Sequence, residues 1–195
     1  MIARMLAVLR SRLFLRRAGA KCGVGVMLEG PRRVSFGRGV SLGDGVRIRS
    51  RCDAAPIRIG SLVRMRDFSE INAKGAPVSL GDYGFIAKLA WIGGCGEIEI
   101  GANVMIGIGT VVVSSDHDYI NIATPYYDGS EIPKPISIGK NVWIGSNCVV
   151  LGGSRIGAGS VVAAGSVVAG EFADDSFIVG VPGVMKSTID RGRPS

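Results

Sequence analysis

Residues 136–168 read ISIGKNVWIGSNCVVLGGSRIGAGSVVAAGSVV, and this stretch decides the fold class. An aliphatic residue returns at every sixth position, at 138, 144, 150, 156, 162 and 168, without a slip. The same period occurs upstream in shifted frames, at 36–48, 59–65, 80–92 and 100–112, so insertions are expected where the frame changes. The fourth residue after each of the first five aliphatics is compact: Val142, Cys148, Ser154, Ser160 and Ser166.

A period of six fits neither an α-helix nor a simple half-buried strand. Six residues rotate a helix by about 600°, which does not keep the aliphatics on one side, whereas a half-buried strand alternates at every second residue. Short strands joined by tight corners do fit, because such coils stack through parallel ladders and share one core. Glycine, at 30 of 195 residues, is about twice as frequent as usual. We therefore expect an all-β parallel β-helix of seven or eight coils over residues 21–180. A β-sandwich of short strands, the alternative, would not keep six unbroken registers.

The only histidine of the chain, His117, stands where the period stops. The hexad 112–117 is followed by DYINIATPYYDGSEIP, so about residues 118–135 are predicted to leave the coils as one loop. Long loops on compact repeat folds are usually functional. His117 takes the sixth place of its hexad and should point outward at the root of this loop. Neutral imidazole is the usual general base near neutral pH. The alternative is a surface or core histidine without a functional role.

The net charge of +7 is concentrated at the start of the chain. The rest is nearly neutral and contains no nucleic-acid motif, so we expect no nucleic-acid partner. Four widely spaced cysteines and one histidine do not make an ordinary zinc set, so no metal is expected and the thiols are predicted to be reduced, as in the cytoplasm. Six basic residues and no acidic residue lie in 1–28: Arg4, Arg10, Arg12, Arg16, Arg17 and Lys21.

Residues 1–20 are predicted to form a basic helix. Their longest apolar run, Met5–Leu9, is too short for a membrane span or a signal-peptide core. We expect the helix to pack on the body or on a partner subunit. Two alternatives stay open, peripheral contact with an anionic membrane surface and an organelle transit peptide. The expected plan is thus a basic helix (1–20), a catalytic β-helix (21–180) and a C-terminal segment (181–195), in the cytoplasm or at the inner face of the membrane.

Four segments together resemble one enzyme family. They are IGANVMIG (100–107), His117, the stretch 136–168 and VGVPG (179–183). They are similar to the hexapeptide-repeat acyltransferases, in the branch of the maltose, galactoside and xenobiotic acetyltransferases and the polysaccharide O-acetyltransferases. The earlier coils match only in period. The resemblance implies a left-handed β-helix, a homotrimer with sites in the clefts between neighbouring subunits, and direct acetyl transfer from acetyl-CoA without an acyl-enzyme.

The resemblance also implies roles for individual residues. His117 would be the general base, and Asp116 or Asp118 would orient its ring, with a structural turn role as the alternative for either. Basic residues that often bind the phosphates of CoA in the family are replaced here, which leaves Lys186, Arg155, Arg191 and Arg193 as candidates. For the donor-binding residues, an apolar patch and plain repeat geometry are the alternatives. The donor side would comprise Trp143, Gly145, Ser146, Ala163 and Ala164, and the acceptor side Lys88, Tyr119 and Tyr126.

Three functions therefore remain open after the sequence alone. The first is an O-acetyltransferase that acts on a sugar hydroxyl of a surface polysaccharide or its precursor. The second is an N-acetyltransferase of a nucleotide-linked amino sugar, and the third is a non-catalytic structural β-helix subunit. A carbonic anhydrase of this fold is excluded, because its zinc site needs three histidines and the chain has one.

Overall fold

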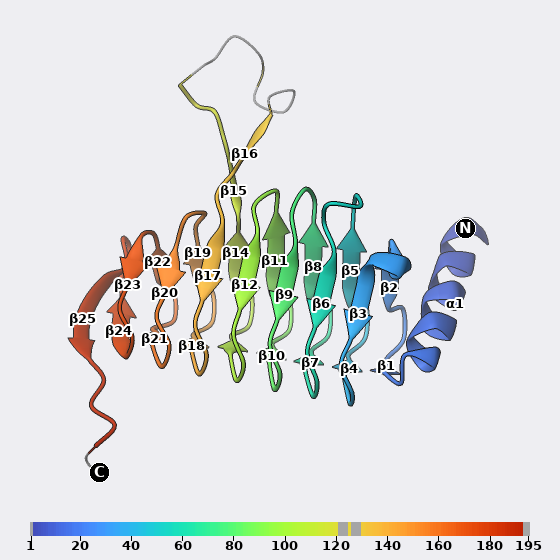
Figure 1. The fold of residues 1–195 in the computed structure, drawn as a ribbon, viewed down its shortest axis with the longest axis horizontal. Coiled ribbons are helices and arrows are strands. Elements are labelled where there is room, and N and C mark those ends of the chain that lie inside the picture. The colour runs from blue at the N-terminus through green and yellow to red at the C-terminus, as the bar shows by residue number, and fades with distance from the viewer. Residues whose placement is uncertain (1, 121–124, 126–129, 193–195) are drawn as a thin grey trace.

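The computed structural model describes residues 2–120, 125 and 130–192. A helix, α1 (Ile2–Arg17), is followed by short parallel strands that stack in about 7 turns (Figure 1). The predicted all-β parallel solenoid with an N-terminal helix is thereby confirmed. One antiparallel ribbon projects from the side of the stack, and the two ends of the chain lie at opposite ends of it (Figure 1).

Three parallel sheets form the sides of the stack, and we call them sheets A, B and C. Sheet A contains β1 (Lys21–Cys22), β4 (Ser41–Leu42), β7 (Arg64–Met65), β10 (Phe85–Ile86), β13 (Met105–Ile106), β18 (Trp143–Ile144), β21 (Val161–Val162), β24 (Ser176–Val179) and the antiparallel β25 (Val184–Thr188). Sheet B contains β2 (Met27–Glu29), β5 (Arg47–Ser50), β8 (Glu70–Ala73), β11 (Trp91–Gly94), β14 (Val111–Val113), β19 (Val149–Val150) and β22 (Val167–Val168). Sheet C contains β3 (Val34–Phe36), preceded by the 3₁₀ turn η1 (Pro31–Arg33), then β6 (Ile57–Ile59), β9 (Val78–Leu80), β12 (Ile98–Ile100), β17 (Ile136–Ile138), β20 (Arg155–Ile156) and β23 (Glu171–Phe172).

The period of six sets which side chains fill the core. Every aliphatic predicted between 138 and 168 is at most 2% exposed, and the compact fourth places are buried as well. The parallel register places the inward residues of successive coils side by side, since Ile106 pairs with Ile144 and Ile144 with Val162. Each fully buried aliphatic contributes about 1.5–3 kcal/mol, but only when the next coil covers it. Upstream, Phe36 is only partly buried and packs against the edge of this core.

The corners need a left-handed backbone at the third place after the inward aliphatic. Asn103, Asn141 and Asn147 have φ values of 56°, 57° and 54° there, and asparagine and glycine tolerate this conformation best. Two successive coils have other residue types at these left-handed positions. Four large, exposed apolar residues take left-handed φ values in them: Leu62, Phe68, Tyr83 and Leu89.

Helix α1 covers the first coil. Leu15 is fully buried, Phe14 packs against the core, and the Ser11 hydroxyl accepts a hydrogen bond of 2.9 Å from the Leu28 N–H. The expected packing on the body is thus found, while membrane contact stays a prediction. In the part of the chain that the structure describes, no helix is long and apolar enough to cross a membrane.

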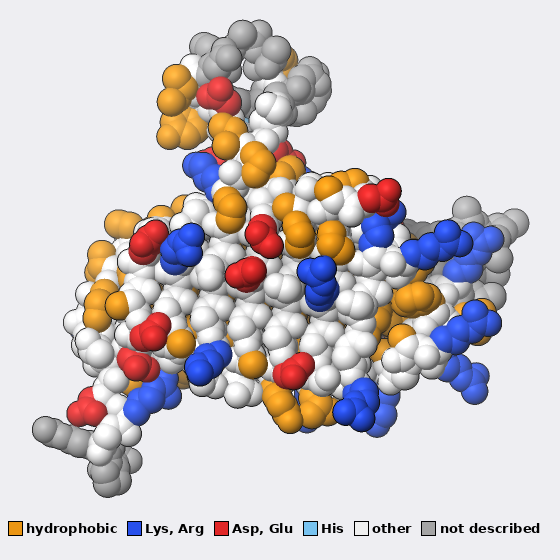
Figure 2. Space-filling model, in the orientation of Figure 1, with side chains coloured by type: hydrophobic (Ala, Val, Ile, Leu, Met, Phe, Trp, Pro, Cys, Tyr) orange, Lys and Arg blue, Asp and Glu red, His pale blue; other side chains and the backbone are white. Residues whose placement is uncertain are grey.

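The extruded segment differs from the predicted loop 118–135. The chain leaves the coils already at Ser115, because β15 (Ser115–His117) pairs antiparallel with β16 (Glu131–Pro133). It rejoins the stack at β17. We call residues 115–133 the arm; Figure 2 shows its described residues projecting from the body, with hydrophobic side chains among them. Tyr126, predicted to contact the acceptor, lies outside the described residues.

Candidate active site

His117 ends the first strand of the arm and is exposed. It pairs in register with Glu131 of β16, so the two side chains leave the same face of the ribbon. The backbone N–H of His117 donates to Asp116 Oδ1 at 2.9 Å. The imidazole therefore stands outside the core, at the root of an extruded ribbon, which is the kind of position that the hexad count predicted. Its role as the base stays a prediction.

The two aspartates that flank His117 bind the arm itself. Asp116 Oδ2 accepts a hydrogen bond of 2.9 Å from Lys134 Nζ, and this bond holds the pKa of the Asp116 carboxyl below its usual value. Asp118 Oδ1 accepts from the Ile120 N–H at 3.0 Å. These contacts hold the root of the arm, and the two roles open for Asp116, ring orientation and a structural turn, both stay predictions.

A third carboxylate, Glu131, was missed by the sequence reasoning. It accepts hydrogen bonds from Ser115 Oγ at 2.7 Å, from Cys95 Sγ at 3.1 Å, and from Lys74 Nζ. The Lys74 ammonium is the main cause of a Glu131 pKa lowered to about 2. Lys74 and Glu131 are 57 positions apart in the sequence. The one available signal was that Glu131 stands where the chain returns from the loop.

The predicted donor-binding residues lie at another edge of the stack, the corner between sheets A and B. Trp143 begins β18 and is 51% exposed beside Met105 of the preceding coil. Ser146 is half-buried and Ala164 is exposed. A Cβ at Gly145 would lie 2.5 Å from the Ala164 backbone nitrogen, so coil stacking alone requires glycine there. Gly145, Ser146, Ala163 and Ala164 thus form a surface of small residues along this corner, which we call the shelf.

The structure does not bring this corner and His117 together within one chain. The arm leaves at the corner between sheets B and C, next to Gly152, whose added Cβ would lie 2.5 Å from Lys134 Cβ. Ser146 and Gly152 lie in the turns at the two ends of β19, so the width of sheet B separates them. The donor-side and base-side residues of one chain therefore face different edges of the solenoid.

The remaining predicted residues are spread over the surface. Lys88 lies on the corner between sheets A and B, where its Nζ is 3.0 Å from Asp67 Oδ2 and lowers the pKa of Asp67. Tyr119 is exposed on the arm, and Lys186 is exposed on β25. A surface hollow of about 540 Å³ on sheet C is lined by Arg155, one of the candidates for the CoA phosphates, and by Glu171 among others. Arg193, another of these candidates, lies outside the described residues. Within the described ranges, no three His, Cys, Asp or Glu side chains gather as a metal site would need.

Comparisons with known proteins agree with the fold. Residues 135–170 match the family model described as bacterial transferase hexapeptide (six repeats). No curated protein matches the chain. Among solved structures, a variant of AntD, an N-acyltransferase from Bacillus cereus in complex with dTDP and coenzyme A, is 18% identical, with a TM-score of 0.59 over 94% of this chain and 88% of that chain.

A second solved structure is a hexapeptide-repeat-containing acetyltransferase from Vibrio cholerae O1 biovar eltor, complexed with acetyl coenzyme A. It is 24% identical, with a TM-score of 0.55 over 93% of this chain and 78% of that chain. At such identities the likeness concerns the fold. The chain thus carries the hexapeptide repeat of bacterial transferases in residues 135–170, on a solenoid that it shares over most of its length with solved acyltransferases.

Proposed function

We propose that the protein is an acyl-CoA-dependent acyltransferase that transfers acetyl from acetyl-CoA to a sugar hydroxyl of a surface polysaccharide or its precursor. One observation carries this proposal. The segment that matches the hexapeptide transferases, 135–170, contains the small-residue corner, while the single histidine of the chain stands exposed at the root of the arm on the preceding coil. Coil stacking alone explains the glycine at 145, but a purely structural solenoid would not need the exposed histidine at the root of an extruded ribbon.

The chemistry needs a general base for the acceptor hydroxyl, a proton for the leaving thiolate, and a hydrogen-bond donor for the thioester oxygen. A neutral His117 imidazole takes the proton of the acceptor hydroxyl as that oxygen attacks the thioester carbonyl carbon. The C–O bond forms, the C–S bond breaks, and the resulting imidazolium returns the proton to the departing CoA thiolate. No acyl-enzyme is required. The thioester oxygen, which carries negative charge in the transition state, needs a hydrogen-bond donor such as a backbone N–H.

The donor side fits a long, thin pantetheine chain. Ser146, Ala163 and Ala164 have side chains too small to keep such a chain away from the backbone of the corner, and Trp143 offers an exposed aromatic wall beside them. Lys186, exposed near the C-terminal end of the stack, is the proposed partner of a CoA phosphate. The Vibrio structure, which is complexed with acetyl coenzyme A, supports a donor of this class.

A second copy of the chain would complete the site. Because one chain holds the shelf and His117 at different corners, the shelf of one protomer must meet the arm of its neighbour. From β10 onward, the outer faces of two sheets favour such packing, because their outward residues are apolar: Phe85, Met105, Trp143 and Val161 on sheet A, and Trp91, Val111 and Val149 on sheet B. In the earlier coils the outward residues are mostly charged or polar, with Lys21, Ser41 and Arg64 on sheet A and Arg47, Arg49 and Glu70 on sheet B. On sheet C the outward positions include Arg58, Glu99, Arg155 and Glu171. We propose a homotrimer, with sheets A and B facing the neighbours.

The second candidate function is N-acylation of a nucleotide-linked amino sugar. A solved variant of AntD is complexed with dTDP-4-amino-4,6-dideoxyglucose and coenzyme A, and it is 22% identical, with a TM-score of 0.54 over 92% of this chain and 89% of that chain. An exposed base at the arm serves either acceptor, because a protonated amine must also lose a proton before it attacks.

The proposed location is the cytoplasm, where acetyl-CoA and such acceptors would meet. A position at the inner face of the membrane is the alternative, because Arg10, Arg16 and Arg17 of α1 are exposed and would favour an anionic surface.

Release of free thiol from acetyl-CoA tests the proposal. Purified protein is assayed with a panel of sugars, oligosaccharides and nucleotide-linked amino sugars. Release that depends on a hydroxyl acceptor supports O-transfer, and release with an amino sugar alone would replace it with N-transfer. Absence of both thiol release and CoA binding would favour a structural subunit and overturn the proposal.

A further inference from the structure

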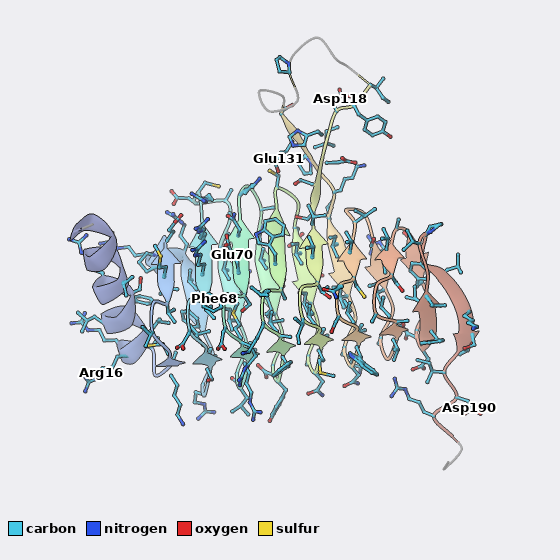
Figure 3. The ribbon with its side chains drawn as sticks, turned by 180° about the vertical axis from the view of Figure 1, so that it is seen from behind. Arg16, Phe68, Glu70, Asp118, Glu131 and Asp190 are labelled. Carbon is cyan, nitrogen blue, oxygen red and sulfur yellow. The ribbon has the colours of Figure 1, made fainter. Side chains whose placement is uncertain are left out.

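The two faces of the arm differ in what they contact. Ser115, His117 and Glu131 lie on one face, because Ser115 and His117 are two positions apart and Glu131 pairs with His117. Asp116 points to the opposite face, where it binds Lys134. Figure 3 shows Glu131 at the root of the arm and Asp118 further out. His117 thus shares its face with Glu131.

Glu131 connects that face to two earlier coils. Lys74 directly follows β8, and Cys95 directly follows β11, whose last residue Gly94 pairs with Ala73. Both side chains reach the Glu131 carboxylate, and Ser115 of the neighbouring strand donates a third hydrogen bond. The face that carries His117 is therefore held toward the coils of β8 and β11, on the N-terminal side of the arm.

The contacts of Glu131 are stronger than an exposed ion pair alone. The side chain of Glu131 is 22% exposed and that of Lys74 is 39% exposed, and a pair at such a surface contributes little by itself. Here, however, the carboxylate also has two further donors. Burial, followed by the hydrogen bond to Glu131, raises the pKa of the Cys95 thiol to about 11, so the thiol keeps the proton that it donates.

The opposite face has a different kind of contact. Asp116 and Lys134 join the outgoing chain to the returning chain at the root of the arm, 18 positions apart, and both are about half-exposed. This pair closes the ribbon without tying it to the coils of β8 or β11. The contacts of Glu131 with Lys74 and Cys95, in contrast, link the arm to these earlier coils through side chains.

We propose that Glu131 is a positioning residue for the reaction: held by Lys74 and Cys95, it fixes the orientation of the arm and so the place of His117. This inference rests on the proposed function, because it takes His117 as the base. Glu131 acts through the ribbon and not on the reacting atoms. A misplacement of the base by about 1 Å can cost up to 100-fold in rate, so a looser arm should lower kcat without changing the donor shelf.

The variants follow from the contacts. Glu131→Gln keeps the size of the side chain but removes its charge, and Lys74→Met removes the ammonium. Lys74→Glu combined with Glu131→Lys restores an ion pair in which the two charges have exchanged places. Glu171→Gln is the matched control, because Glu171 also forms an ion pair between coils, with Arg155 at 3.5 Å, on sheet C away from the arm. Each variant is measured for kcat, for the KM of acetyl-CoA, and for amide hydrogen exchange of residues 115–120.

We expect Glu131→Gln and Lys74→Met to lower kcat about 10- to 100-fold, to leave the KM of acetyl-CoA unchanged, and to speed amide exchange in the arm. The double variant should recover part of both losses, and Glu171→Gln should behave like wild type. Wild-type kcat and wild-type exchange in Glu131→Gln would overturn the proposal, as would an equal loss in Glu171→Gln. If the wild-type protein transfers no acyl group, the proposed function fails. Amide exchange then still decides separately whether Glu131 holds the arm.

Discussion

The two corners that border sheet B are built in opposite ways. The corner between sheets A and B follows the repeat without interruption, and coil stacking requires the glycine at 145, whose added Cβ would meet the Ala164 backbone. At the corner between sheets B and C, the chain leaves the stack for the whole arm and returns at β17. The regular corner offers a surface along which a thin ligand can lie. The interrupted corner offers a base on the arm. Contacts outside the repeat must hold the arm in place.

The largest expected effect is at the interrupted corner. Replacement of His117 by alanine removes the proposed base and should lower acyl transfer about 10²–10⁴-fold. Since His117 is exposed on the arm, thermal unfolding should be unchanged. The measurement is thiol release at saturating acetyl-CoA. Ser130→Ala, an exposed change on the same arm, is the control. Full activity of His117→Ala would show that another group takes the proton.

The regular corner should respond in the donor's KM. Ala164→Trp places a large side chain on the shelf where pantetheine is proposed to lie, and a loss of about 1.4 kcal/mol or more raises the KM of acetyl-CoA at least tenfold. Ala102→Trp is the matched control, because Ala102 holds the same place in its hexad at the corner between sheets C and A. Equal KM values for the two variants would move the donor away from the shelf.

The sequence predicted the regular corner better than the interrupted one. A period of six determines which side chains point inward, so the burial of Ile144 or Val162 follows from counting. The arm could not be derived in that way, because the pairing of 115–117 with 131–133 depends on contacts such as Lys74 with Glu131, far apart in the sequence. The separation of the shelf from His117 depends on which sheet each strand joins, and the period alone does not give this.

A smaller effect should appear with pH. The pKa of Glu131 is lowered from an ordinary 4.5 to about 2, so its ionised form stabilises the arm fully above pH 4.5. That stabilisation should be lost as the pH falls from about 4.5 toward 2. Amide exchange of residues 115–120, corrected for its intrinsic pH dependence, measures this loss. Glu131→Gln should exchange fast throughout, and an equal pH dependence in that variant would assign the effect to another group.

The smallest effect concerns a place where the regular corner departs from its own rule. Leu89 has a φ of 61° and is 61% exposed, so it is strained without being part of the core. Leu89→Asn should stabilise the monomeric fold by roughly 0.5–1 kcal/mol, because asparagine tolerates the left-handed region better. Urea unfolding measures the change. A clear destabilisation would mean that Leu89 is covered in the assembled protein, for example by a neighbouring subunit.

Subunit complementation tests most directly whether the shelf of one copy works with the arm of another. His117→Ala and Ala164→Trp are co-expressed in equal amounts and assayed for thiol release at an acetyl-CoA concentration well below the wild-type KM, where a tenfold higher KM leaves Ala164→Trp with about a tenth of the wild-type activity. If each site uses an arm and a shelf from different protomers, random assembly should return activity to about a quarter of the wild-type level, well above either parent. Activity equal to the average of the two parents would mean that each chain works alone, and would contradict a site shared between copies.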